Sequence, residues 1–110
     1  MGAAKTEIFT DRQNGIARLG KAFGHPARVA ILQHLLTMDG CVCGDLVKEI
    51  GLAQATVSRH LKELKALGLI VGNVEGTSVC YCIDISQWAA MKDTLTQFLD
   101  EDLQRLSQCC

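Results

Sequence analysis

Two helix-forming stretches separated by a tight turn constrain the fold of this chain most strongly. A short helix is predicted over residues 45–50, "DLVKEI", and a longer one over about residues 54–67, where apolar residues recur at helical spacing from Val57 onward. Gly51 ends the first helix, and the turn "GLAQ" leads directly into the second. Two helices joined by so few residues are typical of a helix-turn-helix unit.

The segments around this unit complete a larger pattern. Residues 69–84 form two β-rich runs on either side of "VEGT", which predicts a hairpin. Two helices are expected upstream, the second beginning at Pro26, and an amphipathic helix over about residues 86–106, capped by Ser86, is expected downstream. The order predicts an α+β, mainly α fold: one winged helix-turn-helix domain over residues 1–110, with N- and C-terminal dimerisation helices.

Composition limits the size of the core and the cellular compartment. The chain has 110 residues, 48% of them apolar, which suffices for one modest core. No apolar run approaches the ~20 residues of a membrane span, and the first residues lack the apolar segment of a secretion signal. We therefore expect a cytoplasmic protein with reduced thiols and no membrane partner.

The net charge of the chain is −1, so binding to nucleic acid would require a local basic face. The longer helix supplies such a face. Gln and Arg pair in bidentate fashion with adenine and guanine edges, and short hydroxyls suit phosphates. The residues predicted to contact double-stranded operator DNA are Gln54, Thr56, Ser58, Arg59, His60 and Lys62. A solvated amphipathic helix would show the same charges, but the hairpin that follows favours DNA binding. No cofactor is expected to be required for it.

All six cysteines stand in pairs, at Cys41 and Cys43, Cys80 and Cys82, and Cys109 and Cys110. In a reducing compartment this points to metal or redox chemistry. The residues before the short helix are expected to form a strand that pairs with the second strand of the hairpin. Because residues two apart on a strand point to the same face, three or four of the thiols of Cys41, Cys43, Cys80 and Cys82 could then lie close together. Such a set suits As(III), Zn(II) or Cd(II), with the terminal pair as extra ligands. The alternative is cysteine as a small, buried, inert side chain.

Three stretches resemble one known family: "KAFGHPARVAILQHLL", "CVCGDLVKEIGLAQATVSRHLKELKALGLIVG" and "EGTSVCYCIDI". Together they cover most of the chain and are similar to the ArsR/SmtB metalloregulators. The resemblance implies a homodimeric repressor that binds operator DNA when free of ligand. It would release the DNA when As(III) or another thiophilic ion, such as Cd, Zn or Pb, binds.

The chain departs from the family pattern near its cysteines and in its DNA-binding elements. Gly44 separates the Cys-Val-Cys box from Asp45, so the cysteines are shifted by one residue and the family's sensor site does not carry over unchanged. Cys80 and Cys82 replace the family's usual histidine and basic or polar residue. The recognition helix is preceded by Ala53, not Ser or Thr, and the wing carries no Lys or Arg.

In the family, a second site for zinc lies on the last helix at the dimer interface and is built from four residues: Asp, His, His, and either His or Glu. The matching positions here are Asp84, Ser86, Gln97 and Asp100. None of them is a histidine, so we expect this site to be absent. His25, which precedes Pro26 at a helix start, is expected to be structural.

An apolar stripe on the last helix exceeds what one small domain covers, which predicts a homodimer. The stripe comprises Trp88, Met91, Leu95, Phe98 and Leu99, with Ile8 and Phe9 as additions.

Three functions remain open. The leading one is a repressor released by a thiophilic ligand, and the first alternative is a thiol redox or persulfide sensor of the same fold. A small thiol oxidoreductase is remote, because the chain has no Cys-x-x-Cys and no βαβ pattern. We therefore expect that it is not an enzyme.

Overall fold

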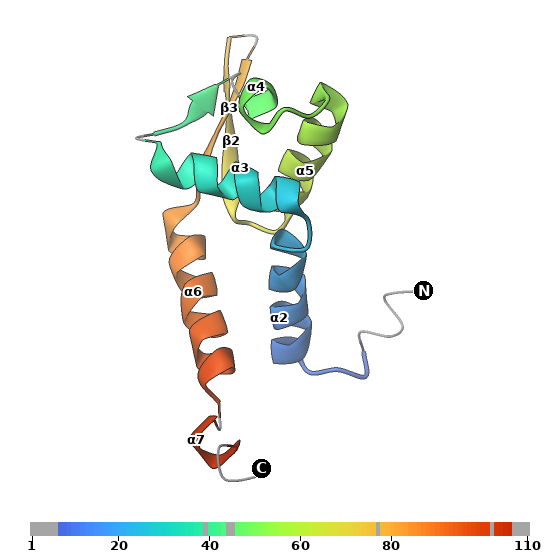
Figure 1. Ribbon diagram of the computed structural model, residues 1–110, viewed down its shortest axis with the longest axis vertical. Helices are drawn as coiled ribbons and strands as arrows, with labels where there is room; N and C mark the ends of the chain where they lie inside the picture. Colours follow the sequence, from blue (N-terminus) through green and yellow to red (C-terminus); the bar gives the residue numbers. More distant parts are fainter. Residues whose placement is uncertain (1–6, 39, 44–45, 77, 102, 107–110) are drawn as a thin grey trace.

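The structure is a computed structural model that describes residues 7–38, 40–43, 46–76, 78–101 and 103–106 (Figure 1). The helices are α2 (Asp11–Ala22), α3 (Pro26–Thr37), α4 (Leu46–Ile50), α5 (Gln54–Ala66), α6 (Ile85–Asp100) and α7 (Leu103–Leu106). The strands are β1 (Val42–Cys43), β2 (Ile70–Glu75) and β3 (Ser78–Ile83). The predicted mainly helical winged helix-turn-helix is confirmed.

Local side-chain hydrogen bonds fix where the first helices begin. Thr10 and Gln13 form a capping box for α2, with each side chain 3.0 Å from the other residue's backbone nitrogen. For α3, Pro26 occupies the first turn and His25 Nδ1 accepts a hydrogen bond from the Ala27 N–H at 3.0 Å. The structural role predicted for His25 is confirmed.

Glycines in the left-handed conformation set the limits of the helix-turn-helix. Gly51, with φ of 78°, follows α4, and Gly68, with φ of 84°, follows α5. Ala53 precedes α5 and makes no side-chain capping bond, as its methyl group predicts.

The described strands form one antiparallel sheet in the order β1-β3-β2. The hairpin pairs Ile70 with Ile83 at one end and Glu75 with Ser78 at the other. On its other side, β3 pairs with β1, which sets Val42 across from Tyr81 and Cys43 across from Cys80. The predicted pairing between the strand before the short helix and the second hairpin strand is confirmed.

The core lies between α3, α5 and the sheet, and α6 reaches it through Met91. Its most buried large side chains are Ile31, Leu32, Leu64, Leu69 and Ile70. This core holds α5 against the sheet while leaving the outer face of α5 open to solvent.

The C-terminal part differs from the sequence prediction. A single helix over residues 86–106 is wrong, because Glu101 has extended backbone geometry and separates α6 from α7. Ser86 is not the cap: Asp84 Oδ1 accepts a hydrogen bond from the Gln87 N–H at 3.2 Å, and Ser86 Oγ donates to the same oxygen.

Helices α2 and α6 lie side by side and project together from the rest of the molecule (Figure 1). Met91, predicted as part of an exposed stripe, is only 5% exposed and belongs to the core. Phe98, Leu99, Leu103 and Leu106 remain exposed at the far end. No helix in the described ranges is both long and apolar enough to cross a bilayer.

Candidate functional site

The β1–β3 pairing brings cysteines from distant parts of the sequence together. The Cα atoms of Cys43 and Cys80 stand directly opposite, and continuing this register sets Cys41 across from Cys82. A hydrogen bond joins the thiols of Cys41 and Cys82. The convergence predicted for these two cysteines is therefore present in the structure.

The described cysteines differ in state and burial. Cys41 and Cys82 carry free thiols, the first exposed and the second half-buried. Cys80 is fully buried and disulfide-bonded. Of the described residues, no group of three or more His, Cys, Asp or Glu is arranged to hold a metal ion. The side chain of Cys43, and Cys109 and Cys110 altogether, lie outside what the structure describes, so a site with more ligands stays a prediction.

The environment of Cys82 favours its neutral thiol. The hydrogen bond with Cys41, burial, and the nearby Cys41 and Asp84 charges raise the pKa of Cys82 to about 11. Only the thiolate is a strong nucleophile and metal ligand. Ligand binding at Cys82 must therefore release a proton near neutral pH, and its affinity should rise with pH.

We expect Cys82 to react with iodoacetamide far more slowly than Cys41 at pH 7.5. Cys82 is half-buried and has a raised pKa, whereas Cys41 is exposed. Tandem mass spectrometry of briefly alkylated protein measures both sites. The Cys82 rate should still be rising at pH 10, and a plateau by pH 8.5 would contradict the raised pKa.

Asn73 is a neighbour of the cysteines that sequence reasoning missed. Its Nδ2 donates to Cys41 Sγ at 3.7 Å, from a β2 position across from Cys80. The alternation of the hairpin strands was the signal that could have found it. Asn73 connects the thiol pair to the wing.

The recognition helix presents most of its predicted DNA contacts. Gln54, Ser58, Arg59 and Lys62 are exposed on α5, and Thr56 is half-buried. Gln54 and Ser58 also line a hollow of about 340 Å³ that reaches Ser78 and Tyr81 of β3. The exposed hydrogen-bonding side chains of α5 thus stand beside the wing.

His60 is a correction to the predicted DNA contacts, because the structure buries it. Its side chain is only 4% exposed on the buried face of α5, and its ring centroid is 4.5 Å from that of His25. Its Nδ1 accepts from Arg28 Nε at 3.1 Å, while its Nε2 has no hydrogen-bond partner among the described residues. Arg28 also pairs with Glu63. His60 therefore ties α5 to the start of α3.

The burial of His60 predicts a pH dependence of stability. Burial lowers its pKa, as do the charges of His25, Arg28 and Arg59, with Glu63 opposing. A lowered pKa in the folded state gives stability that is present above about pH 6.5, the unfolded value, and lost as pH falls. We expect the free energy of unfolding to drop between pH 7.5 and 5.5, and to drop less in His60→Gln. Urea denaturation at both pH values measures this, and equal drops would contradict it.

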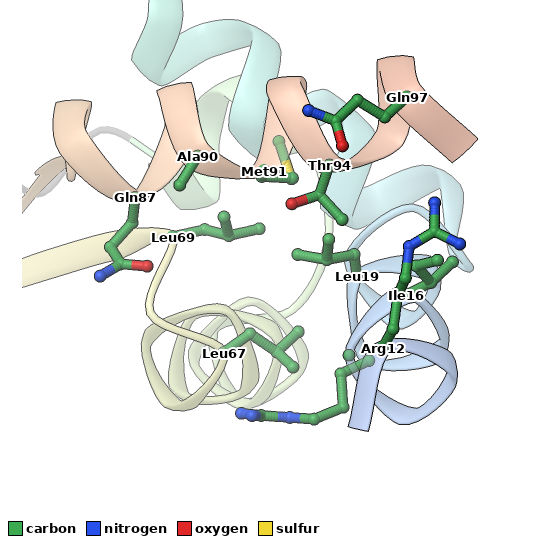
Figure 2. A pocket seen from close by; sticks show the side chains of 12 residues that line it. Arg12, Ile16, Leu19, Leu67, Leu69, Gln87, Ala90, Met91, Thr94 and Gln97 are labelled. Atoms are coloured by element: carbon green, nitrogen blue, oxygen red, sulfur yellow. The ribbon is translucent and has the colours of Figure 1, made fainter. Parts of the chain in front are cut away.

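A groove separates α2 from α6. It has a volume of about 480 Å³, and Figure 2 shows Leu19, Leu67, Leu69 and Met91 around it, with Gln87 and Gln97 at its α6 side. Arg12 of α2 pairs with Glu101 after α6. The groove thus lies between the two projecting helices, with the Arg12–Glu101 ion pair joining them.

The positions matching the family's zinc site lie along α6 and its cap. Asp84 and Ser86 bond to one another, and Gln97 Nε2 donates to Asp93 Oδ2 at 3.3 Å. These side chains are engaged in capping and helix-surface hydrogen bonds.

Comparison with known proteins identifies the family. A helix-turn-helix domain model matches residues 23–73. CmtR of Mycobacterium tuberculosis, an HTH-type transcriptional regulator, is 40% identical over 87 residues, which are 78% of this chain and 72% of CmtR. The chain belongs to the ArsR/SmtB family. It is thus a DNA-binding transcription regulator of a family that includes metal sensors, and that family is not one of enzymes.

Solved structures agree with this assignment. The NMR structure of the cadmium metal-sensor CmtR from Mycobacterium tuberculosis is 38% identical, with a TM-score of 0.53 over 76% of this chain and 85% of that one. A homodimeric winged helix-turn-helix domain from Mycobacterium bovis, a possible ArsR-family regulator, is 28% identical, with a TM-score of 0.63 over 88% of this chain and 93% of that one.

Proposed function

We propose that this protein is a homodimeric repressor that leaves its operator DNA when a thiophilic ligand binds the cysteines of β1 and β3. The observation that carries the proposal is the contact between Cys41 and Cys82. It joins the wing to the segment directly before α4, the first helix of the helix-turn-helix. A ligand bound there spans both halves of the DNA-binding unit.

The donor atoms define the ligand class. Paired cysteine sulfurs select soft ions such as As(III), Cd(II), Zn(II) and Pb(II) over hard ones. The name of CmtR, a cadmium metal-sensor, supports Cd(II) among them. Cys43, Cys80, Cys109 and Cys110 are proposed as further ligands, Cys80 once its disulfide is reduced.

Release requires that the ligand bind one conformation better than the other. Residue 43 ends β1 and α4 begins at Leu46, so a ligand that shifts β1 along its pairing with β3 also shifts the start of α4. The α5 helix follows after a turn of three residues, Gly51 to Ala53. We propose that this chain connection carries the change to the residues that contact DNA: Gln54, Thr56, Ser58, Arg59 and Lys62.

A redox-sensing repressor is the second candidate, and the disulfide at Cys80 favours it. Cross-strand Cα atoms lie within the distance that a disulfide spans, so oxidation could join the two strands as a metal ion would. In that case the reversible step is thiol oxidation by a peroxide or persulfide.

One titration separates the two candidates. Fully reduced protein on its own promoter DNA is titrated in parallel with arsenite, Cd(II), Zn(II) and a persulfide donor, with fluorescence anisotropy as the readout. Release by a stoichiometric ion under reducing conditions supports the proposal. Release by the persulfide donor alone, reversed by dithiothreitol, supports the redox candidate.

We expect a dimer formed through α2 and α6. Phe98 and Leu99 at the end of α6 and Leu103 and Leu106 of α7 are exposed apolar side chains, and the Mycobacterium bovis domain is homodimeric. Light scattering at micromolar concentration should give twice the chain mass of 11.9 kDa. The double variant Phe98→Glu, Leu99→Glu should halve it, and a wild-type monomer would refute the dimer.

A further inference from the structure

An apolar hollow opens beside Cys82, between the end of α3 and the start of α6. Its volume is about 410 Å³, within the range of roughly 300–1,000 Å³ that is usual for small-molecule sites. Besides Cys82, its walls include Leu35, Leu36, Met38, Ile83, Ile85 and Trp88. The DNA-binding surface on α5 does not use this hollow.

Several of these walls are unusually exposed for apolar side chains. Leu36 is 49%, Met38 47% and Ile85 80% exposed, so water covers apolar surface next to a thiol pair. Trp88 is held by an edge-on contact with Phe23, with ring centroids 6.5 Å apart. The hollow thus has one wall fixed by packing and an open apolar rim that a ligand group would cover.

Among the described cysteines, two free thiols meet beside the hollow, and Cys82 is the one that lines it. Of the described cysteines, Cys41 and Cys82 carry free thiols and contact each other, whereas Cys80 is disulfide-bonded. A dithiol replaces two oxygen ligands of As(III). Arsenite would keep a third hydroxyl beside apolar side chains, where burying an unpaired polar group is unfavourable.

We propose that the hollow receives the organic group of a trivalent arsenical with one carbon substituent, bound through Cys41 and Cys82. This rests on the proposed function of the same cysteines. With R–As(OH)₂, each S–H forms one As–S bond and releases one water. Arsenic stays in the +3 state, and the As–C bond is unbroken. The group R then lies against Met38, Ile85 and Trp88, which sets the preference for an organic over an inorganic ligand.

Phenylarsine oxide, hydrated in water, and arsenite are the two probes. Trp88 is the only tryptophan of the chain and lines the hollow, so its fluorescence reports binding. The full chain, purified without added thiol, should bind phenylarsine oxide with a change in Trp88 emission and a loss of two titratable thiols per bound arsenic.

The deciding variant is Met38→Ala, Ile85→Ala, which truncates exposed walls and spares the core. It should weaken phenylarsine oxide binding by roughly tenfold or more, because less apolar surface is buried, while arsenite affinity changes less than about twofold. Val74→Ala, a 77% exposed position on the wing, is the matched control and should change neither affinity.

The other outcomes overturn the inference. Equal weakening for both probes, or none, shows that the hollow does not select an organic group. A change of sedimentation mass in the double variant shows that the hollow is an interface between copies of the chain. Unaltered binding of both probes by the double variant Cys41→Ser, Cys82→Ser would refute the proposed cysteine site itself. A loss of selectivity between the probes would refute only the role of the hollow.

Discussion

Serine at both positions 41 and 82 is expected to leave operator affinity unchanged and to raise the inducer concentration needed for release by at least about 100-fold. Loss of a residue that merely supports a metal ligand already costs roughly 10- to 100-fold, and this variant removes two ligands. Neither side chain lies on α5 or in the core. Anisotropy titrations of the operator complex with arsenite and Cd(II) measure the effect.

Variants at the other cysteines rank how much each contributes to release by the inducer. Cys43→Ser should also reduce release, because residue 43 ends the strand that leads to α4. Serine at 109 and 110 should matter less, because chain termini are rarely held in place. The matched control is Gln33→Ala at an exposed position of α3, which keeps all cysteines and lies outside α5 and the wing. Wild-type release by the double variant would show that the sensor lies elsewhere.

Local signals explain why the helix-turn-helix could be predicted. Gly51 and Gly68 end their helices through their own backbone freedom, and Pro26 begins α3 through its own ring. The β1–β3 pairing was predicted from the alternation of paired strands in a winged helix, and Cys41 and Cys82 meet as it requires. The disulfide bond of Cys80 could not be predicted in this way, because strand register decides which residues face each other and not whether two facing thiols are oxidised.

The predictions for His60 and for the end of the last helix were wrong because polar residues there were not recognised as structural signals. Val57, His60, Leu61 and Leu64 share one helical face and are all buried, so the spacing does place His60 inside. Arg28 supplies the hydrogen bond that a buried histidine needs, from 32 residues away in the sequence. Asp100 and Glu101 at the end of α6 oppose the helix dipole, a local signal for the break before α7.

Replacing Arg59 by alanine is expected to weaken specific operator binding by about 5- to 150-fold for each recognition helix that reads a base. That range corresponds to the ~1–3 kcal/mol of one bidentate contact between arginine and guanine. Arg59 is exposed on α5, in the first two turns beside Gln54 and Ser58, so its truncation removes little packing. Thermal denaturation should therefore be nearly unchanged.

Salt dependence separates a base contact from a phosphate contact. Arg59→Ala should lower the preference for operator over random DNA. Lys62→Ala should instead weaken both alike and reduce the salt slope by about one unit for each phosphate that the lysine no longer neutralises. Lys92→Ala, at an exposed position of α6 outside the lining of the groove, is the charge-matched control and should alter neither. If Arg59→Ala retains the operator preference at fixed salt, sequence is read by other residues of α5, and the exposed Gln54 is then the next candidate.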